Sequence, residues 1–77
     1  MSRFTVYAKW DSEAGVWTAF SDDIPGLVTE APSWDELKER LRAAAAELIQ
    51  LNNVKIDRDG GELHIVTDER VSVLAAA

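Results

Sequence analysis

The sequence has 77 residues and no cysteine, and its eight basic and fourteen acidic side chains give a formal net charge of −6. A chain of this length forms one domain, residues 1–77, with a thin hydrophobic core. The negative charge argues against direct nucleic-acid binding, because phosphate contacts need cationic side chains. Without cysteine, disulfides and thiolate chemistry are excluded.

The sequence also lacks the marks of membrane or secreted proteins. No apolar run approaches the ~18 residues of a membrane span. The first residues, MSRFTVYAKWD, contain no apolar signal core followed by a small-residue cleavage site. We therefore expect a cytoplasmic protein with no membrane partner.

Two strands and a turn are predicted at the N-terminal end. Residues 3–10 alternate between apolar and polar, residues 11–15 form a turn that ends on glycine, and residues 16–21 return. We expect Trp10 to pair with Val16, which leaves Tyr7 and Trp17 on the polar face. A slip of one residue would exchange the faces of the second strand. The preferred register separates apolar side chains better, with one face made of Phe4, Val6, Ala8, Trp10, Val16 and Phe20.

A turn at 22–26 and a short strand at 27–31 lead to the clearest helix, residues 34–51. Ser33 stands at the N-cap position and Glu36 three residues later completes a capping box. The pair Asn52-Asn53 is a helix stop. Apolar residues recur at three- and four-residue steps, which predicts a buried stripe of Trp34, Leu37, Leu41, Ala44, Leu48 and Leu51.

After the helix we expect an extended stretch at 54–56, a tight turn at 57–61 and a fourth strand at 62–67. Residues 71–74 suit either a further short strand or an extended tail. The predicted fold class is α+β with the order β-β-β-α-β, an antiparallel meander with one helix packed on one face. Because one helix cannot cover both faces of the sheet, Tyr7, Trp17 and Val28 are expected on an open face.

Four motifs stand out: Asp11, Gly15-Val16-Trp17 with Ala19, Asp23-Ile24-Pro25-Gly26-Leu27, and the helix opening Ser33-Trp34-Asp35-Glu36-Leu37. Together these motifs resemble those of the HicB-like antitoxin domain. The sequence is still more similar to the small DUF1902 group of uncharacterised HicB-like proteins, in which W-D, V-W-x-A and S-D-D-hydrophobic-P-G-L recur. The resemblance covers residues 5–51 well and the rest loosely.

The resemblance implies a truncated ribonuclease-H-like fold and a specific role. A HicB-like antitoxin binds and neutralises a small basic ribonuclease toxin of the HicA type. Three departures concern Ser21-Asp22, where HicB proteins usually carry an aromatic residue and proline, Leu27 in place of a common cysteine, and Ala31-Pro32 in place of a glycine. No helix-turn-helix or ribbon-helix-helix segment follows residue 51, so operator binding is not expected to carry over.

Catalysis is not expected. A ribonuclease-H site needs a carboxylate inside the first strand to hold metal ions, and residues 3–10 contain none. The two acidic turns, Asp11 with Glu13 and Asp22 with Asp23, are predicted at opposite ends of the hairpin. The single histidine, His64, has no nucleophile partner in the pattern. We expect no enzyme, metal site or cofactor.

Three functional hypotheses remain at this point. The first is a HicB-like protein-binding module whose acidic meander attracts a basic protein. The second is a self-associating structural domain without a toxin, and a homodimer or higher homo-oligomer is expected under either hypothesis. A metal-dependent nuclease ranks last. For the first hypothesis, the predicted partner-binding residues are Tyr7, Asp11, Glu13, Trp17, Asp22, Asp23, Ile24 and Glu30.

Overall fold

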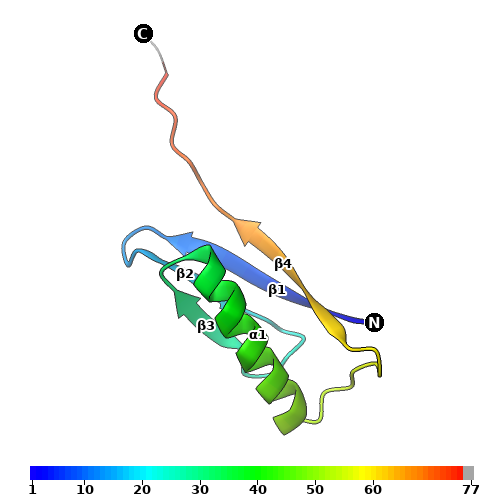
Figure 1. The fold of residues 1–77 in the computed structure, drawn as a ribbon. Helices are drawn as coiled ribbons and strands as arrows, with labels where there is room; N and C mark the ends of the chain where they lie inside the picture. The colour runs from blue at the N-terminus through cyan, green and yellow to red at the C-terminus, as the bar shows by residue number, and fades with distance from the viewer. Residues whose placement is uncertain (76–77) are drawn as a thin grey trace.

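The architecture is a four-stranded sheet with one helix on one face (Figure 1). The structure is a computed structural model and describes residues 1–75. Its elements in chain order are β1 (Ser2–Asp11), β2 (Val16–Phe20), β3 (Val28–Ala31), α1 (Trp34–Leu51) and β4 (Gly61–Asp68). This confirms the α+β class and the β-β-β-α-β order. No helix among residues 1–75 combines the length and apolar character needed to cross a membrane.

The sheet is mixed, with the strand order β3-β2-β1-β4. The first three strands form the expected antiparallel meander, whereas β4 lies on the other side of β1 and runs parallel to it. Parallel pairing requires a crossover connection, and α1 supplies it between β3 and β4. Both β3 and β4 are therefore edge strands.

The register expected for the hairpin is wrong by one residue. Asp11 lies opposite Val16, and Trp10 lies opposite Trp17. The slip exchanges the faces of β2, so that Ala19 is buried and Phe20 is exposed. We attribute it to tertiary packing: Trp17 makes an edge-on contact with Trp34 of α1, with ring centroids 4.9 Å apart. The alternation of apolar and polar residues within the hairpin cannot predict that contact, because Trp34 lies outside the hairpin.

Local chemistry explains the turns and caps. The first turn is held by Asp11, whose Oδ1 accepts from the backbone N–H groups of Glu13 and Ala14 at 3.1 and 3.2 Å. Ser33 caps α1 by accepting from the N–H of Glu36 at 3.2 Å, as predicted. Asn52 is the C-cap. These features depend only on neighbouring residues, which is why the sequence predicts them.

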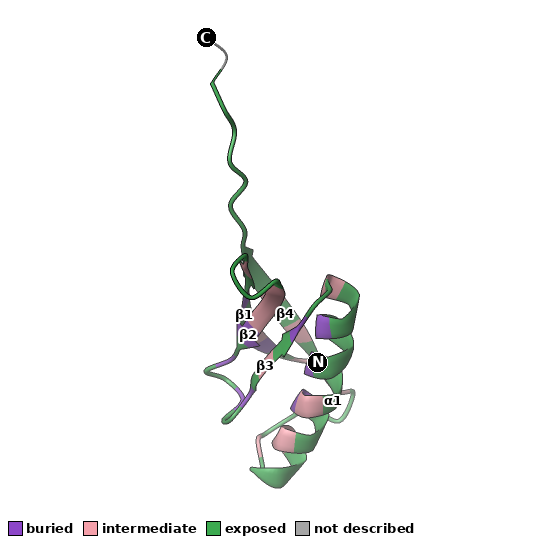
Figure 2. Cartoon of the chain, turned by 90° about the vertical axis from the view of Figure 1, so that its left-hand side faces the viewer, coloured by how far each residue is buried: buried purple, intermediate pink, exposed green. Residues whose placement is uncertain are grey.

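The core lies between the sheet and α1 (Figure 2). The helix buries Leu37, Leu41 and Ala45, whereas Leu51, predicted to belong to the buried stripe, is exposed. Small side chains on the central strands leave room for the helical leucines to approach the sheet. The buried apolar residues are Phe4, Val6, Ala8, Ala19, Ile24, Leu27, Ala31, Leu37, Leu41 and Ala45.

A side-chain contact replaces strand pairing beyond the end of β2. Pairing of β1 with β2 covers only residues 7–11 of β1, which leaves Thr5 without a strand partner on that side. Ser21 Oγ donates to the Thr5 carbonyl oxygen at 2.6 Å, and Asp23 Oδ2 accepts from the Thr5 N–H at 2.6 Å. Ser21 Oγ also accepts from the Asp23 N–H at 3.1 Å. We call this arrangement the Ser21–Asp23 latch.

Candidate protein-interaction face

The face of the sheet opposite α1 carries an apolar row that crosses all four strands. Tyr7 on β1 lies opposite Phe20 on β2 and Val66 on β4, and Phe20 lies opposite Val28 on β3. The exposed fractions are 44% for Tyr7, 48% for Phe20, 75% for Val28 and 42% for Val66. The rings of Tyr7 and Phe20 contact each other with centroids 5.5 Å apart. Contiguous exposed apolar surface of this kind is typical of interaction sites.

Charged side chains flank this row, which we call the open-face row. On one side, Glu30 of β3 and Asp68 of β4 lie across the sheet with Lys9 between them on β1. On the other side, Glu62 of β4 accepts from Arg3 Nε of β1 at 3.0 Å. The acidic side chains of the face outnumber the basic ones. An apolar centre with a charged rim is the usual anatomy of a protein interface.

Two of the predicted partner-binding residues, Trp17 and Ile24, do not lie on the open face. Trp17 lies on the helix side of the sheet, half-buried between Trp10 and Trp34, with centroids 5.6 and 4.9 Å away. Ile24 is 0% exposed and belongs to the core. The register shift explains why Trp17 lies on the helix side of the sheet. Ile24 is buried because the loop between β2 and β3 packs into the core. Asn52 Nδ2, at the end of α1, donates to the Pro25 carbonyl oxygen of this loop at 3.3 Å.

The other six predicted residues divide into three groups. Tyr7 and Glu30 are exposed on the open face. Asp23 accepts a backbone hydrogen bond in the latch and Asp11 accepts two in the first turn, so both carboxylates have structural partners. Glu13 and Asp22 are exposed in loops.

The acidic turns lie far apart. Asp11 ends β1, whereas Asp23 is bonded to Thr5, six residues earlier in the same strand. Six residues of strand span ~20 Å. Among residues 1–75, no cluster of three or more His, Asp or Glu side chains has the geometry to hold a metal ion. His64 lies on the open face, opposite Thr5.

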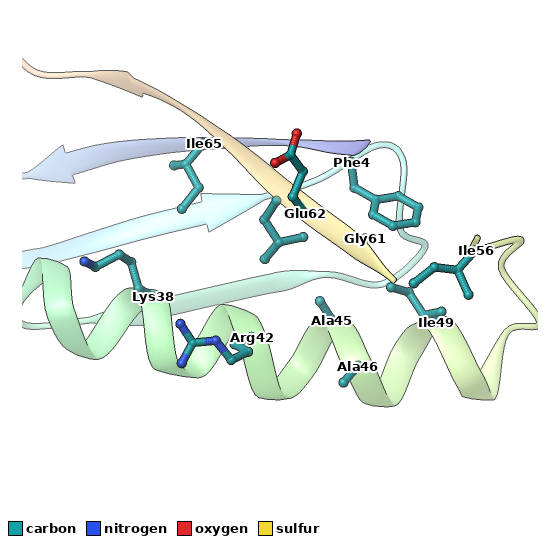
Figure 3. Close-up of a pocket in the computed structure, with 11 residues that line it drawn as sticks. Phe4, Lys38, Arg42, Ala45, Ala46, Ile49, Ile56, Gly61, Glu62 and Ile65 are labelled. Carbon is teal, nitrogen blue, oxygen red and sulfur yellow. The ribbon is translucent and has the colours of Figure 1, made fainter. Parts of the chain in front are cut away.

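A second surface feature is a groove of about 430 Å³ between α1 and β4. The helix contacts β3 and β2 and leaves the β4 side of the sheet partly uncovered. Apolar side chains from α1, β1, β4 and the loop before β4 form the walls, and Lys38 and Arg42 stand at the rim (Figure 3). The Glu62 side chain points away from the helix, toward the open face. The apolar wall residues are Phe4, Ala45, Ala46, Ile49, Ile56, Leu63 and Ile65.

Phe20 and Val66 are the members of the open-face row that the sequence-based prediction missed. Phe20 was assigned to the core face because of the wrong register. The sequence-based prediction gives Val66 no functional role. The alternation in β4 nevertheless places Val66 on the exposed face with His64, opposite to Leu63 and Ile65. The alternation was therefore a usable signal for Val66, but none was available for Phe20.

The fold is a small α+β domain with a four-stranded mixed sheet, one helix and one exposed sheet face. A family model described as "Domain of unknown function (DUF1902)" matches residues 3–76, so the chain belongs to the DUF1902 family. The structure is similar to the crystal structure of a hypothetical protein from the extremely thermophilic bacterium Thermus thermophilus. The two chains are 39% identical, the match covers 92% of this chain and 99% of that chain, and the TM-score is 0.80. No curated protein matches the chain.

Proposed function

We propose that this protein is a non-catalytic protein-binding module of the HicB-like kind, and that its open face binds a small basic protein such as a HicA-type toxin. The observation that carries the proposal is the open-face row, Tyr7, Phe20, Val28 and Val66, on a protein of net charge −6. Burial of aromatic side chains supplies affinity. A long-range negative field speeds encounter with a cationic partner.

The charge distribution favours a basic partner over an acidic one. Residues 1–36, which form the meander and the helix start, contain Arg3 and Lys9 as their only basic side chains. The same segment contains seven acidic side chains, Asp11, Glu13, Asp22, Asp23, Glu30, Asp35 and Glu36. A cationic protein approaching the sheet therefore meets attraction around an apolar centre. The partner should bind more weakly as salt is added, because salt screens the exposed charges.

The test is binding of a purified HicA-type toxin from the same genome, measured by calorimetry. Phe20→Thr removes the ring at the centre of the row and keeps a residue suited to a strand. Loss of a central aromatic anchor costs about 2 kcal/mol of binding energy, so we expect affinity to fall about 30-fold. The matched control is Ile56→Thr, which removes a partly exposed apolar side chain away from the open face.

Each outcome of this test bears on the proposal. Weaker binding for Phe20→Thr with unchanged binding for Ile56→Thr supports the open face as the interface. A complex that is insensitive to both substitutions would show that the toxin binds elsewhere. Absence of any complex at micromolar concentration would remove the antitoxin proposal and leave the self-associating domain as the function to be tested.

A further inference from the structure

Two unpaired features adjoin each other at the end of the described residues 1–75: the free edge of β4, and residues 69–75, which we call the apolar arm. β4 is an edge strand that pairs only with β1. Residues 69–75 continue away from the sheet and the helix, and the molecule measures 57 Å along its longest axis against 22 and 19 Å across it (Figures 1 and 2). The exposed fractions of Val71, Val73 and Leu74 are 79%, 87% and 96%. A long edge strand with an apolar extension is a template for pairing with another chain.

We propose that a second copy of this chain occupies that edge, and that two β4 strands pair antiparallel about a two-fold axis at Val66. This assembly is independent of the toxin-binding proposal. A two-fold axis perpendicular to the sheet keeps both helices on the same side, so residues that face each other must belong to the same face. Because side chains alternate between the two faces along a strand, this requirement is met only when the axis passes through a residue that faces its own copy in the partner.

Charge selects among these registers, since opposite charges stabilise a cross-strand pair and like charges destabilise it. A dyad at Val66 places Glu62 opposite the partner's Arg70 and His64 opposite the partner's Asp68. A dyad at Ile65 instead places Glu62 opposite the partner's Asp68.

A dyad at His64 is also unfavourable, because it places Arg58 opposite the partner's Arg70 and Asp59 opposite the partner's Glu69. Every such pair occurs twice in a symmetric dimer, so its attraction or repulsion counts twice. Of the registers centred on His64, Ile65 and Val66, the one at Val66 brings no like charges together, and it is the one that we propose.

The same register gives the apolar arm a place to bind. With the dyad at Val66, Gly61 lies opposite the partner's Val71. Gly61 closes the end of the groove between α1 and β4, where a methyl group built on it would lie 3.0 Å from the Phe4 ring and 3.2 Å from Ile56. A valine from a second chain, arriving beside Gly61, thus lies next to Ile56, whose side chain is 42% exposed in the single copy.

The proposed dimer would also extend the open-face row. Because Val66 ends the open-face row at the β4 edge, a dyad at this residue joins the two rows end to end. Val66 would contact the partner's Val66, and one apolar stripe would run across eight strands. Registers centred on Ile65 or His64 would offset the two rows.

Single cysteines test the pairing directly, because the natural sequence contains none. Val66→Cys places two thiols opposite each other at a Cα separation of about 4.5–5.5 Å, which a disulfide spans. Val28→Cys is the matched control, since Val28 is an exposed valine on the same face but on the other edge strand, β3. Under mild oxidation we expect rapid covalent dimer formation for Val66→Cys and little for Val28→Cys.

A charge reversal tests the register. Arg70→Glu brings two carboxylates together at each of two symmetric positions, and we expect the dimer dissociation constant to rise about tenfold in sedimentation experiments. Adding Glu62→Arg to that variant should restore dimer formation relative to Glu62→Arg alone, which is the reference because this substitution also removes the ion pair of Glu62 with Arg3. Thermal unfolding followed by circular dichroism checks that each variant folds.

Three results would overturn the proposal. The first is a strict monomer in sedimentation at high micromolar concentration, including the case in which the arm folds back on its own groove. The second is faster cross-linking of Val28→Cys than of Val66→Cys, which would indicate pairing through β3. The third is a charge reversal that leaves the dimer unchanged.

Discussion

Replacing Ser21 by alanine tests the role of the latch. The substitution removes the donor to the Thr5 carbonyl oxygen at 2.6 Å and the acceptor for the Asp23 N–H at 3.1 Å. At about 1 kcal/mol for each hydrogen bond, the free energy of unfolding should fall by about 2 kcal/mol. A domain of this length has a total stability of about 4–12 kcal/mol, so the loss is a large fraction of it.

Thermal unfolding and urea titration followed by circular dichroism measure this loss. For a domain of this size, 1 kcal/mol corresponds to about 4–8 °C in Tm, so Ser21→Ala should melt about 8–16 °C lower. The matched control is Ser12→Ala in the exposed first turn, which should change stability by less than about 0.5 kcal/mol. Equal stability of the two variants would refute the latch.

A double-mutant cycle sharpens the result. Ser21 Oγ and Asp23 Oδ2 bind the carbonyl oxygen and the N–H of the same residue, Thr5, and Ser21 Oγ also accepts from the backbone N–H of Asp23. Ser21→Ala and Asp23→Ala should therefore together cost less than the sum of the single effects, by about 0.5–3 kcal/mol. Strict additivity would mean that the two side chains act independently and that the latch is not a unit.

Two further substitutions follow from the fold. Ile24→Ala should lower the free energy of unfolding by about 2–5 kcal/mol in urea titration, because the side chain is fully buried; a loss below 1 kcal/mol would place Ile24 outside the core. Gly26→Ala should cost about 1–2 kcal/mol, because Gly26 has a φ of +84° that disfavours a side chain. Gly61→Ala, at a glycine without that positive φ, serves as a comparison, with any cost there arising from crowding by Phe4.

The sequence predicts the features that depend on near neighbours. Ser33 caps the helix three residues from its partner, and Asp57 to Gly60 form the expected tight turn, in which Gly60 has a φ of +99°. The alternation in β4 likewise separates Leu63 and Ile65 from His64, as predicted. In each case, the cause lies within a few residues of the effect.

The wrong predictions depend on contacts that are distant in sequence. The register of the hairpin is associated with packing of Trp17 against Trp34, which is seventeen residues away in the chain. The burial of Ile24 accompanies contact of its loop with the end of α1, where Asn52 bonds to Pro25, twenty-seven residues away in the chain. The parallel placement of β4 beside β1 joins residues about sixty positions apart. No local pattern contains this information, and the open-face row was therefore predicted only at Tyr7 and Val28.

The most direct test of the proposed function is calorimetric titration of the protein with a purified HicA-type toxin from the same genome, for the unmodified chain and for Phe20→Thr. We expect a complex with micromolar or tighter affinity that the substitution weakens about 30-fold. Absence of a complex, or equal affinity without the Phe20 ring, would contradict the proposed function.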